Sequence, residues 1–251
     1  MLPNLNIGPV TLPMPALILL GGIWLGIYLT EKFAPRFGVN SSNVSSLILL
    51  MLFTGIIGAR LSYVAHYPNA FLENPADVIS RSPGMLDPIG GFVLAVIGGI
   101  QYGQRKGLPF WQTLDALTPG IAILAVCLGL SHLASGSAFG KPTQLPWGVV
   151  LWGEYRHPTQ VYEIILAGLI FGLILPYHTY WKNAQPGVLF LGYLALSAAS
   201  RLFLEAFRGD SPLLWNSIRT AQLLAWMVLA LSLWGIQRRV SRKTTTNSSG
   251  C

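Results

Sequence analysis

The stretch FWQTLDALTPGIAILAVCLGLSHL, from Phe110 to Leu133, is apolar over a length sufficient to cross the hydrocarbon core of a bilayer, which takes about 20 residues. Six further stretches have the same character: Met14–Leu29, Val44–His66, Pro88–Gln104, Pro158–Leu175, Pro186–Phe207 and Thr220–Ile236. The sequence therefore predicts an all-α integral membrane protein with about seven transmembrane helices.

The composition of the whole chain leads to the same class of protein. Of its 251 residues, 52% are hydrophobic and only 10% are charged, and the mean hydropathy is +0.54. Soluble domains carry about 25% charged residues. The composition thus excludes a soluble globular domain, a disordered chain and a nucleic-acid-binding module, so no nucleic acid partner is expected.

The net charge of +7 is distributed unequally between the two sides of the predicted bundle. Nine basic residues fall on one side: Lys32, Arg36, Arg105, Lys106, Lys182, Arg238, Arg239, Arg242 and Lys243. Five fall on the other: Arg81, Lys141, Arg156, Arg208 and Arg219. Because Lys and Arg accumulate on cytoplasmic loops, we expect a cytoplasmic C-terminus and, with seven spans, an N-terminus outside.

Two outer segments, Tyr67–Asp87 and Ala134–His157, are long enough to be structured, as functional loops often are. Residues 1–237 are expected to form one polytopic membrane domain. Residues 238–251 (RRVSRKTTTNSSGC) are basic and then rich in Ser and Thr, which is typical of a cytoplasmic tail without fixed structure.

Ionisable residues inside a membrane are costly, so each one is a functional candidate. The candidates are Arg60, Glu163, Arg201 and Glu205, with Arg208 at the outer end of the sixth span. Spacings of four and three place Arg201, Glu205 and Arg208 on one helix face. Guanidinium groups in such a stripe suit a phosphate, but the stripe equally fits an ion-pair network between helices, and both interpretations remain open.

Arg60 lies in the sequence GARLSYV, where Gly55, Gly58 and Ala59 allow another helix to approach closely. A structural role, in which Arg60 pairs with Glu163 or Glu205, is favoured over ligand contact.

The sequence RHPTQVYE, Arg156 to Glu163, opens the fifth span. Pro158 suits a first helical turn and Tyr162 suits a membrane interface, whereas Gln160 and Glu163 recur on one face. A capped helix start explains the proline and the tyrosine, but not a glutamate that enters the bilayer.

His132 ends the apolar run of the fourth span, a position more typical of a hydrogen-bonded structural histidine than of a base. No pair of His, Cys or carboxylate residues has the spacing of metal ligands, so we expect neither a metal nor another cofactor.

The motifs GARLSYV, Gly90–Gly91, GKPTQLPWGV, RHPTQVYE and RLFLEAFRGD, in this order between Pro15 and Ile236, resemble the prolipoprotein diacylglyceryl transferase family. The resemblance implies an enzyme of the bacterial inner membrane, with seven spans and the N-terminus outside. Such enzymes move a diacylglyceryl group from phosphatidylglycerol to the cysteine thiol of a lipoprotein signal peptide, and glycerol phosphate leaves without the help of a metal.

The resemblance also implies roles for particular residues. Arg201 would hold the lipid headgroup, and Glu205 and Arg208 would order that arginine. Three residues would line the cavity, namely Glu163, Tyr162 and Gln160. Arg60 would brace the core, and Gly140 matches a glycine of the signature loop of the family.

The chain departs from the family pattern at several positions. A histidine expected beside the paired glycines is absent from GGFVLAVIGG, where Ala95 or a neighbour takes its place. In the signature loop, GLSHLASGSAFGK, an arginine is replaced by Gly129 or Leu130, one asparagine by His132 and a glutamate by Ser137. His132 is therefore a candidate replacement for the base, since a histidine has a pKa suited to forming a thiolate.

Three functions remain open on the sequence alone. The first is a divergent diacylglyceryl transferase that acts on phosphatidylglycerol and lipoprotein signal peptides. The second is an inactive relative that serves as a lipid-binding or structural subunit of a larger membrane complex. The third and weakest is a small-solute transporter, because no inverted repeat is visible.

Overall fold

The structure is a computed structural model of the whole chain. It describes residues 4–7, 10–73, 75–79, 83–151, 153–175, 184–211, 213–214 and 218–248. The chain forms two compact units, one of residues 1–33 with 114–251 and the other of residues 34–113.

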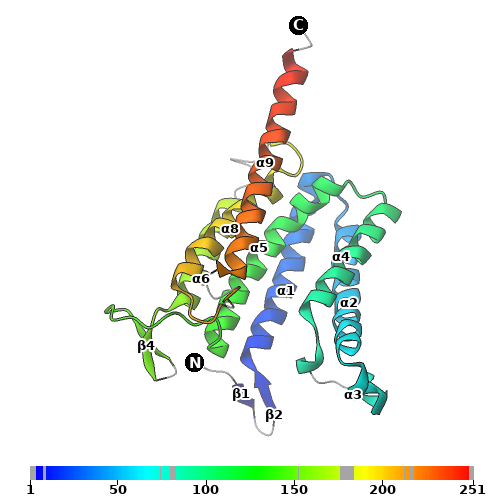
Figure 1. Cartoon of the computed structure of the whole chain (residues 1–251). Coiled ribbons are helices and arrows are strands. Elements are labelled where there is room, and N and C mark those ends of the chain that lie inside the picture. The colour runs from blue at the N-terminus through cyan, green and yellow to red at the C-terminus, as the bar shows by residue number, and fades with distance from the viewer. Residues whose placement is uncertain are drawn as a thin grey trace. The chain divides into compact units, whose positions relative to one another are not determined.

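Each of the seven expected spans coincides with a helix in the described part of the chain. These helices are α1 (Met14–Phe33), α2 (Ser41–His66), α4 (Pro88–Arg105), α5 (Phe110–Ser135), α6 (Thr159–Ile174), α8 (Val188–Phe207) and α9 (Thr220–Ser248) (Figure 1). Five of them, α1, α2, α5, α8 and α9, are long and apolar enough to cross a membrane, and α6 is apolar but has 16 residues. The prediction of an all-α membrane protein is confirmed.

The connections between these helices contain short regular elements. The segment that follows α2 contains α3 (Pro68–Glu73) and two 3-10 turns, Pro75–Ile79 and Pro83–Met85, and another 3-10 turn, Ala34–Phe37, follows α1. Three antiparallel hairpins pair β1 (Asn4–Ile7) with β2 (Val10–Pro13), β3 (Val149–Leu151) with β4 (Glu154–Arg156), and β5 (Leu213–Leu214) with β6 (Ile218–Arg219). The described residues of both expected outer segments include these regular elements, and residues 136–148 and His157 form loop.

In the unit of residues 34–113, α2 packs along α4 through small residues. A Cβ on Gly58 would lie 2.5 Å from the Leu94 Cβ, and one on Gly91 would lie 2.9 Å from the carbonyl oxygen of Gly55. The helix backbones can approach this closely only because those positions carry no side chain. The prediction that Gly55, Gly58 and their neighbours allow a close helix contact is confirmed.

In the other unit, α8 packs against both α6 and α9, and α1 meets α5 at glycines (Figure 1). A buried carboxylate fixes the start of α8, because Asp115 of α5 accepts hydrogen bonds from the backbone N–H groups of Gly187, at 2.5 Å, and Phe190, at 2.9 Å. The last helix, α9, continues to Ser248 and so runs through most of the segment expected to be an unstructured tail.

Candidate functional site

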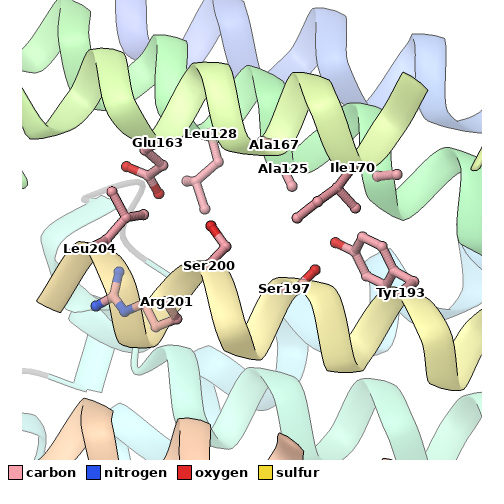
Figure 2. A pocket seen from close by; sticks show the side chains of 11 residues that line it. Ala125, Leu128, Glu163, Ala167, Ile170, Tyr193, Ser197, Ser200, Arg201 and Leu204 are labelled. Atoms are coloured by element: carbon pink, nitrogen blue, oxygen red, sulfur yellow. The ribbon is translucent and has the colours of Figure 1, made fainter. Parts of the chain in front are cut away.

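A pocket of about 120 Å³ opens between α5, α6 and α8. Its walls are mainly apolar, with polar groups from α6 and α8; the lining residues are Ala122, Ala125, Leu128, Glu163, Ala167, Ile170, Tyr193, Ser197, Ser200, Arg201 and Leu204. Figure 2 shows the Glu163 carboxylate pointing into this space from α6, with Ser200 and Arg201 on the opposite wall.

Arg201 is the cation of this pocket. It shares one face of α8 with Tyr193, Ser197 and Leu204, because residues three and four apart line up along a helix. Its side chain keeps 36% of its exposure, and within the described residues its guanidinium donates no hydrogen bond. The N–H groups of Arg201 are therefore available to an oxygen-bearing ligand.

Glu205 lies fully buried one turn further along α8. Its Oε1 is 3.0 Å from Arg201 Nη2, an ion pair without hydrogen-bond alignment, since this oxygen makes no hydrogen bond in the described structure. Its Oε2 accepts a hydrogen bond from the Ser211 hydroxyl at 2.5 Å and one from Arg219 Nη1 at 3.4 Å. Arg219 also donates to the Glu205 carbonyl oxygen. One carboxylate thus stands between two arginines.

His132 of α5 lies beside Glu163. Its Nδ1 is 2.8 Å from Glu163 Oε2, and the two side chains keep 24% and 15% of their exposure. When Nδ1 donates to the carboxylate, Nε2 of the neutral ring carries the free lone pair. His132 therefore connects to the pocket through Glu163, which lines it.

Arg208 does not lie on the face of α8 that its spacing from Arg201 and Glu205 predicts. The helix α8 ends at Phe207, and Arg208 has an extended backbone (φ −69°, ψ 141°). Its guanidinium forms a two-pronged pair with Asp210, Nε to Oδ1 at 3.0 Å and Nη2 to Oδ2 at 3.2 Å. The stripe of three charges on α8 is in fact Arg201 and Glu205 alone.

Of the three residues expected to line the cavity from RHPTQVYE, only Glu163 does so. Gln160 is buried and donates from Nε2 to the carbonyl oxygen of Ser137 at 2.9 Å. The Tyr162 hydroxyl accepts a hydrogen bond from Trp147 Nε1 at 2.9 Å, and its ring lines a separate aromatic groove. Tyr162 and Glu163 are adjacent on α6 and so point about 100° apart around the axis, whereas Gln160, in the first turn of α6, is held by its hydrogen bond to Ser137.

Gly140 lies where the loop of residues 136–157 crosses the ends of α6 and α8. It pairs with Arg208 in an isolated antiparallel bridge, and a Cβ on Gly140 would lie only 2.6 Å from the His157 Cβ. The next residue, Lys141, accepts from His157 N–H at 3.0 Å and donates its own N–H to Phe207 at 2.8 Å. Glycine is required here because three backbone segments meet.

Arg60 belongs to the unit of residues 34–113 and braces the segment that follows α2. It donates to the backbone carbonyls of Val78, at 2.8 Å, and Met85, at 2.9 Å, and also to that of Asp77. These three partners are carbonyl oxygens of the segment that follows α2. Arg60 therefore braces the segment between α2 and α4.

Several polar residues of the site are not singled out by any sequence motif. Arg219 stands in the sequence only among the charges that set orientation, and the others are Ser197, Ser200, Asp210 and Ser211. The spacing of Ser197, Ser200 and Arg201 on one helical face was the available signal for the two pocket serines. In the part of the chain that the structure describes, no three His, Cys, Asp or Glu side chains form a group able to hold a metal ion.

Comparison with known proteins gives one consistent result. The model of the family described as prolipoprotein diacylglyceryl transferase matches residues 4–238. Proteins named phosphatidylglycerol–prolipoprotein diacylglyceryl transferase are similar to this chain: that of a Nostoc strain is 29% identical over 95% of this chain and 89% of its own length. That of Bacillus mycoides is 30% identical over 91% and 88%, and that of Streptococcus pneumoniae 29% over 91% and 90%. The chain belongs to the prolipoprotein diacylglyceryl transferase family.

Proposed function

We propose that this protein transfers a diacylglyceryl group from phosphatidylglycerol to the cysteine thiol of a lipoprotein signal peptide, in the inner membrane of a bacterium. The observation that carries the proposal is the pocket of Arg201 and Glu163, which combines a partly exposed guanidinium with apolar walls inside a helix bundle. The family and the names of its similar members support the same reaction.

Each part of the pocket suits one part of the lipid. The guanidinium of Arg201 offers a planar fork of donors to the phosphate oxygens, and a charged contact of this kind contributes about 1.5–3 kcal/mol. The Ser200 hydroxyl, on the same wall, is placed to donate to the headgroup. The apolar residues, among them Leu128, Ile170 and Leu204, suit the glyceryl and acyl part of the molecule.

His132 and Glu163 are proposed as the base and the group that orients it. The Glu163 carboxylate holds Nδ1–H of the imidazole, which leaves Nε2 to take the proton of the cysteine thiol. The thiolate sulfur then bonds to the glyceryl carbon, the bond from that carbon to the phosphate oxygen breaks, and glycerol phosphate leaves with the electron pair. Arg201 stabilises the negative charge of this leaving group.

The direct test supplies purified protein with phosphatidylglycerol vesicles and a synthetic peptide that carries a lipoprotein signal-peptide cysteine. Mass spectrometry should detect the diacylglyceryl thioether of the peptide together with free glycerol phosphate. An R201Q variant should lose the product while it keeps its elution profile in detergent.

The assay also separates the competing functions. Absence of the thioether, together with tight co-purification of phospholipid, would favour a lipid-binding subunit of a membrane complex over an enzyme. Absence of both product and bound lipid would contradict the proposed site as well.

A further inference from the structure

We propose that Arg219 is a positioning residue, which keeps the charge of Arg201 available to the phosphate by neutralising Glu205. The inference rests on the proposed function only for the identity of the ligand. Its basis is the ion-pair cluster of Arg201, Glu205 and Arg219 in the unit that holds the pocket.

The two carboxylate oxygens of Glu205 have different partners. Oε2 takes both hydrogen bonds to the carboxylate, from the Ser211 hydroxyl and from Arg219. Oε1 lies 3.0 Å from Arg201 and makes no hydrogen bond among the described residues. The carboxylate therefore attracts Arg201 without occupying its N–H groups.

The burial of these groups makes the balance of charge important. Glu205 has no exposed side-chain surface, and Arg219 keeps 16%, so water screens their interaction weakly. Two guanidinium groups around one carboxylate leave a net charge of +1, which suits a single phosphodiester. Without Arg219, Glu205 and Arg201 would neutralise each other, and the guanidinium would be drawn away from the pocket.

Secondary structure fixes the position of Arg219 in the chain. It ends the β5–β6 hairpin, where it pairs with Leu213, and the next residue begins α9. Ser211 stands just before the same hairpin. Ser211 and Arg219 lie near the two ends of the connection between α8 and α9, and both donate to the Glu205 carboxylate.

The test compares lipid binding of wild type and variants in detergent by native mass spectrometry, with phosphatidylglycerol and with diacylglycerol, which lacks the phosphate. R219Q should weaken binding of phosphatidylglycerol by about tenfold or more and leave diacylglycerol unchanged. R219K, which keeps the charge, should recover part of that loss. R238Q is the matched control, because Arg238 is a cation of α9 that stacks on Trp234.

A double-mutant cycle tests whether Arg219 acts through Glu205. In the E205Q background, R219Q should have little further effect, since no carboxylate remains to be neutralised. A full tenfold loss in that background, equal losses for both lipids, or no loss at all would each overturn the proposal. If R219Q does not fold, the same cycle with R219M, which also removes the charge, decides the question.

This outcome is separable from the outcome of the proposed function. A wild-type protein that forms no thioether would refute the transferase, whereas the phosphate-dependent difference between the two lipids would still decide the role of Arg219.

Discussion

At the scale of single residues, the contact of His132 with Glu163 gives the proposed base a partner. The Nδ1–Oε2 distance of 2.8 Å gives the imidazole a carboxylate partner, which is the arrangement that orients a general base. A histidine with only a packing role would not need a carboxylate that also lines a pocket.

We therefore predict that H132A lowers the rate of thioether formation by about 10²–10⁴-fold, the usual effect of removing a general base. Thermal unfolding in detergent and binding of phosphatidylglycerol should change little, because neither depends on proton transfer. Activity equal to wild type in a well-folded H132A protein would eliminate His132 as the base.

Asp87 gives a second prediction at this scale, one that concerns stability and pH. The Ser62 hydroxyl, which is the main cause, and the Ile89 N–H donate to its carboxylate and hold its pKa below the ordinary value of 3.8. A carboxylate whose pKa is lowered by folding stabilises the folded state above its unfolded pKa, and this contribution is lost as the pH falls through the folded pKa.

The D87A variant should therefore unfold at a lower temperature than wild type at pH 7, because α4 loses its N-terminal cap. The difference should shrink as the pH falls below 3.8. D77A is the control, since Asp77 contributes its backbone carbonyl to Arg60 and its side chain is exposed. A difference that is constant between pH 7 and pH 3 would show that the ionised carboxylate is not the stabilising group.

At the scale of elements, the pairing of α2 with α4 depends on positions without side chains. A Cβ on Gly58 would lie 2.5 Å from the Leu94 Cβ and 2.8 Å from the Gly90 carbonyl oxygen, and backbone atoms cannot yield as a flexible side chain can. G58A should therefore cost about 1–3 kcal/mol of stability, as overpacking does.

The matched variant is G103A, on α4, where an added Cβ would meet no atom within 4 Å. It should leave the unfolding temperature unchanged or raise it slightly, because alanine favours a helix over glycine by about 0.5–1 kcal/mol. Equal unfolding temperatures for G58A and wild type, measured by circular dichroism in detergent, would contradict the close contact between α2 and α4.

The elements also show what a sequence can and cannot predict. All seven long helices follow from apolar length, but their ends depend on local chemistry. The helix α2 begins at Ser41 and not at Val44, because the Asn40 side chain accepts hydrogen bonds from Ser42 and Asn43 N–H. The helix α8 begins after Gly187, whose φ of +91° cannot continue a helix.

The site was predictable only where helical spacing determines it. Spacing places Arg201 beside Glu205, where the two form an ion pair, and the cost of burying charge singles out Glu163, which lines the pocket. The contact of Arg219 with Glu205 depends on the β5–β6 hairpin, and that of His132 with Glu163 depends on how α5 packs on α6. No periodicity within one segment contains such information, because the partners come from different elements.

At the scale of the whole molecule, apolar helices and family membership make this a multi-pass membrane protein, but its orientation is still a prediction from loop charges. The excess of Lys and Arg predicts that the β3–β4 hairpin lies outside and the C-terminus inside.

The natural cysteines make this orientation testable. Cys127 is buried at 7% exposure, so Cys251 is the thiol expected to react with a membrane-impermeant maleimide. Intact spheroplasts should leave Cys251 unlabelled until the membrane is permeabilised. In the variant Y155C/C251S, which carries its thiol at an exposed position of β4, labelling should occur without permeabilisation. The reverse pattern would place the hairpin at the cytoplasmic face and contradict the orientation predicted from the loop charges.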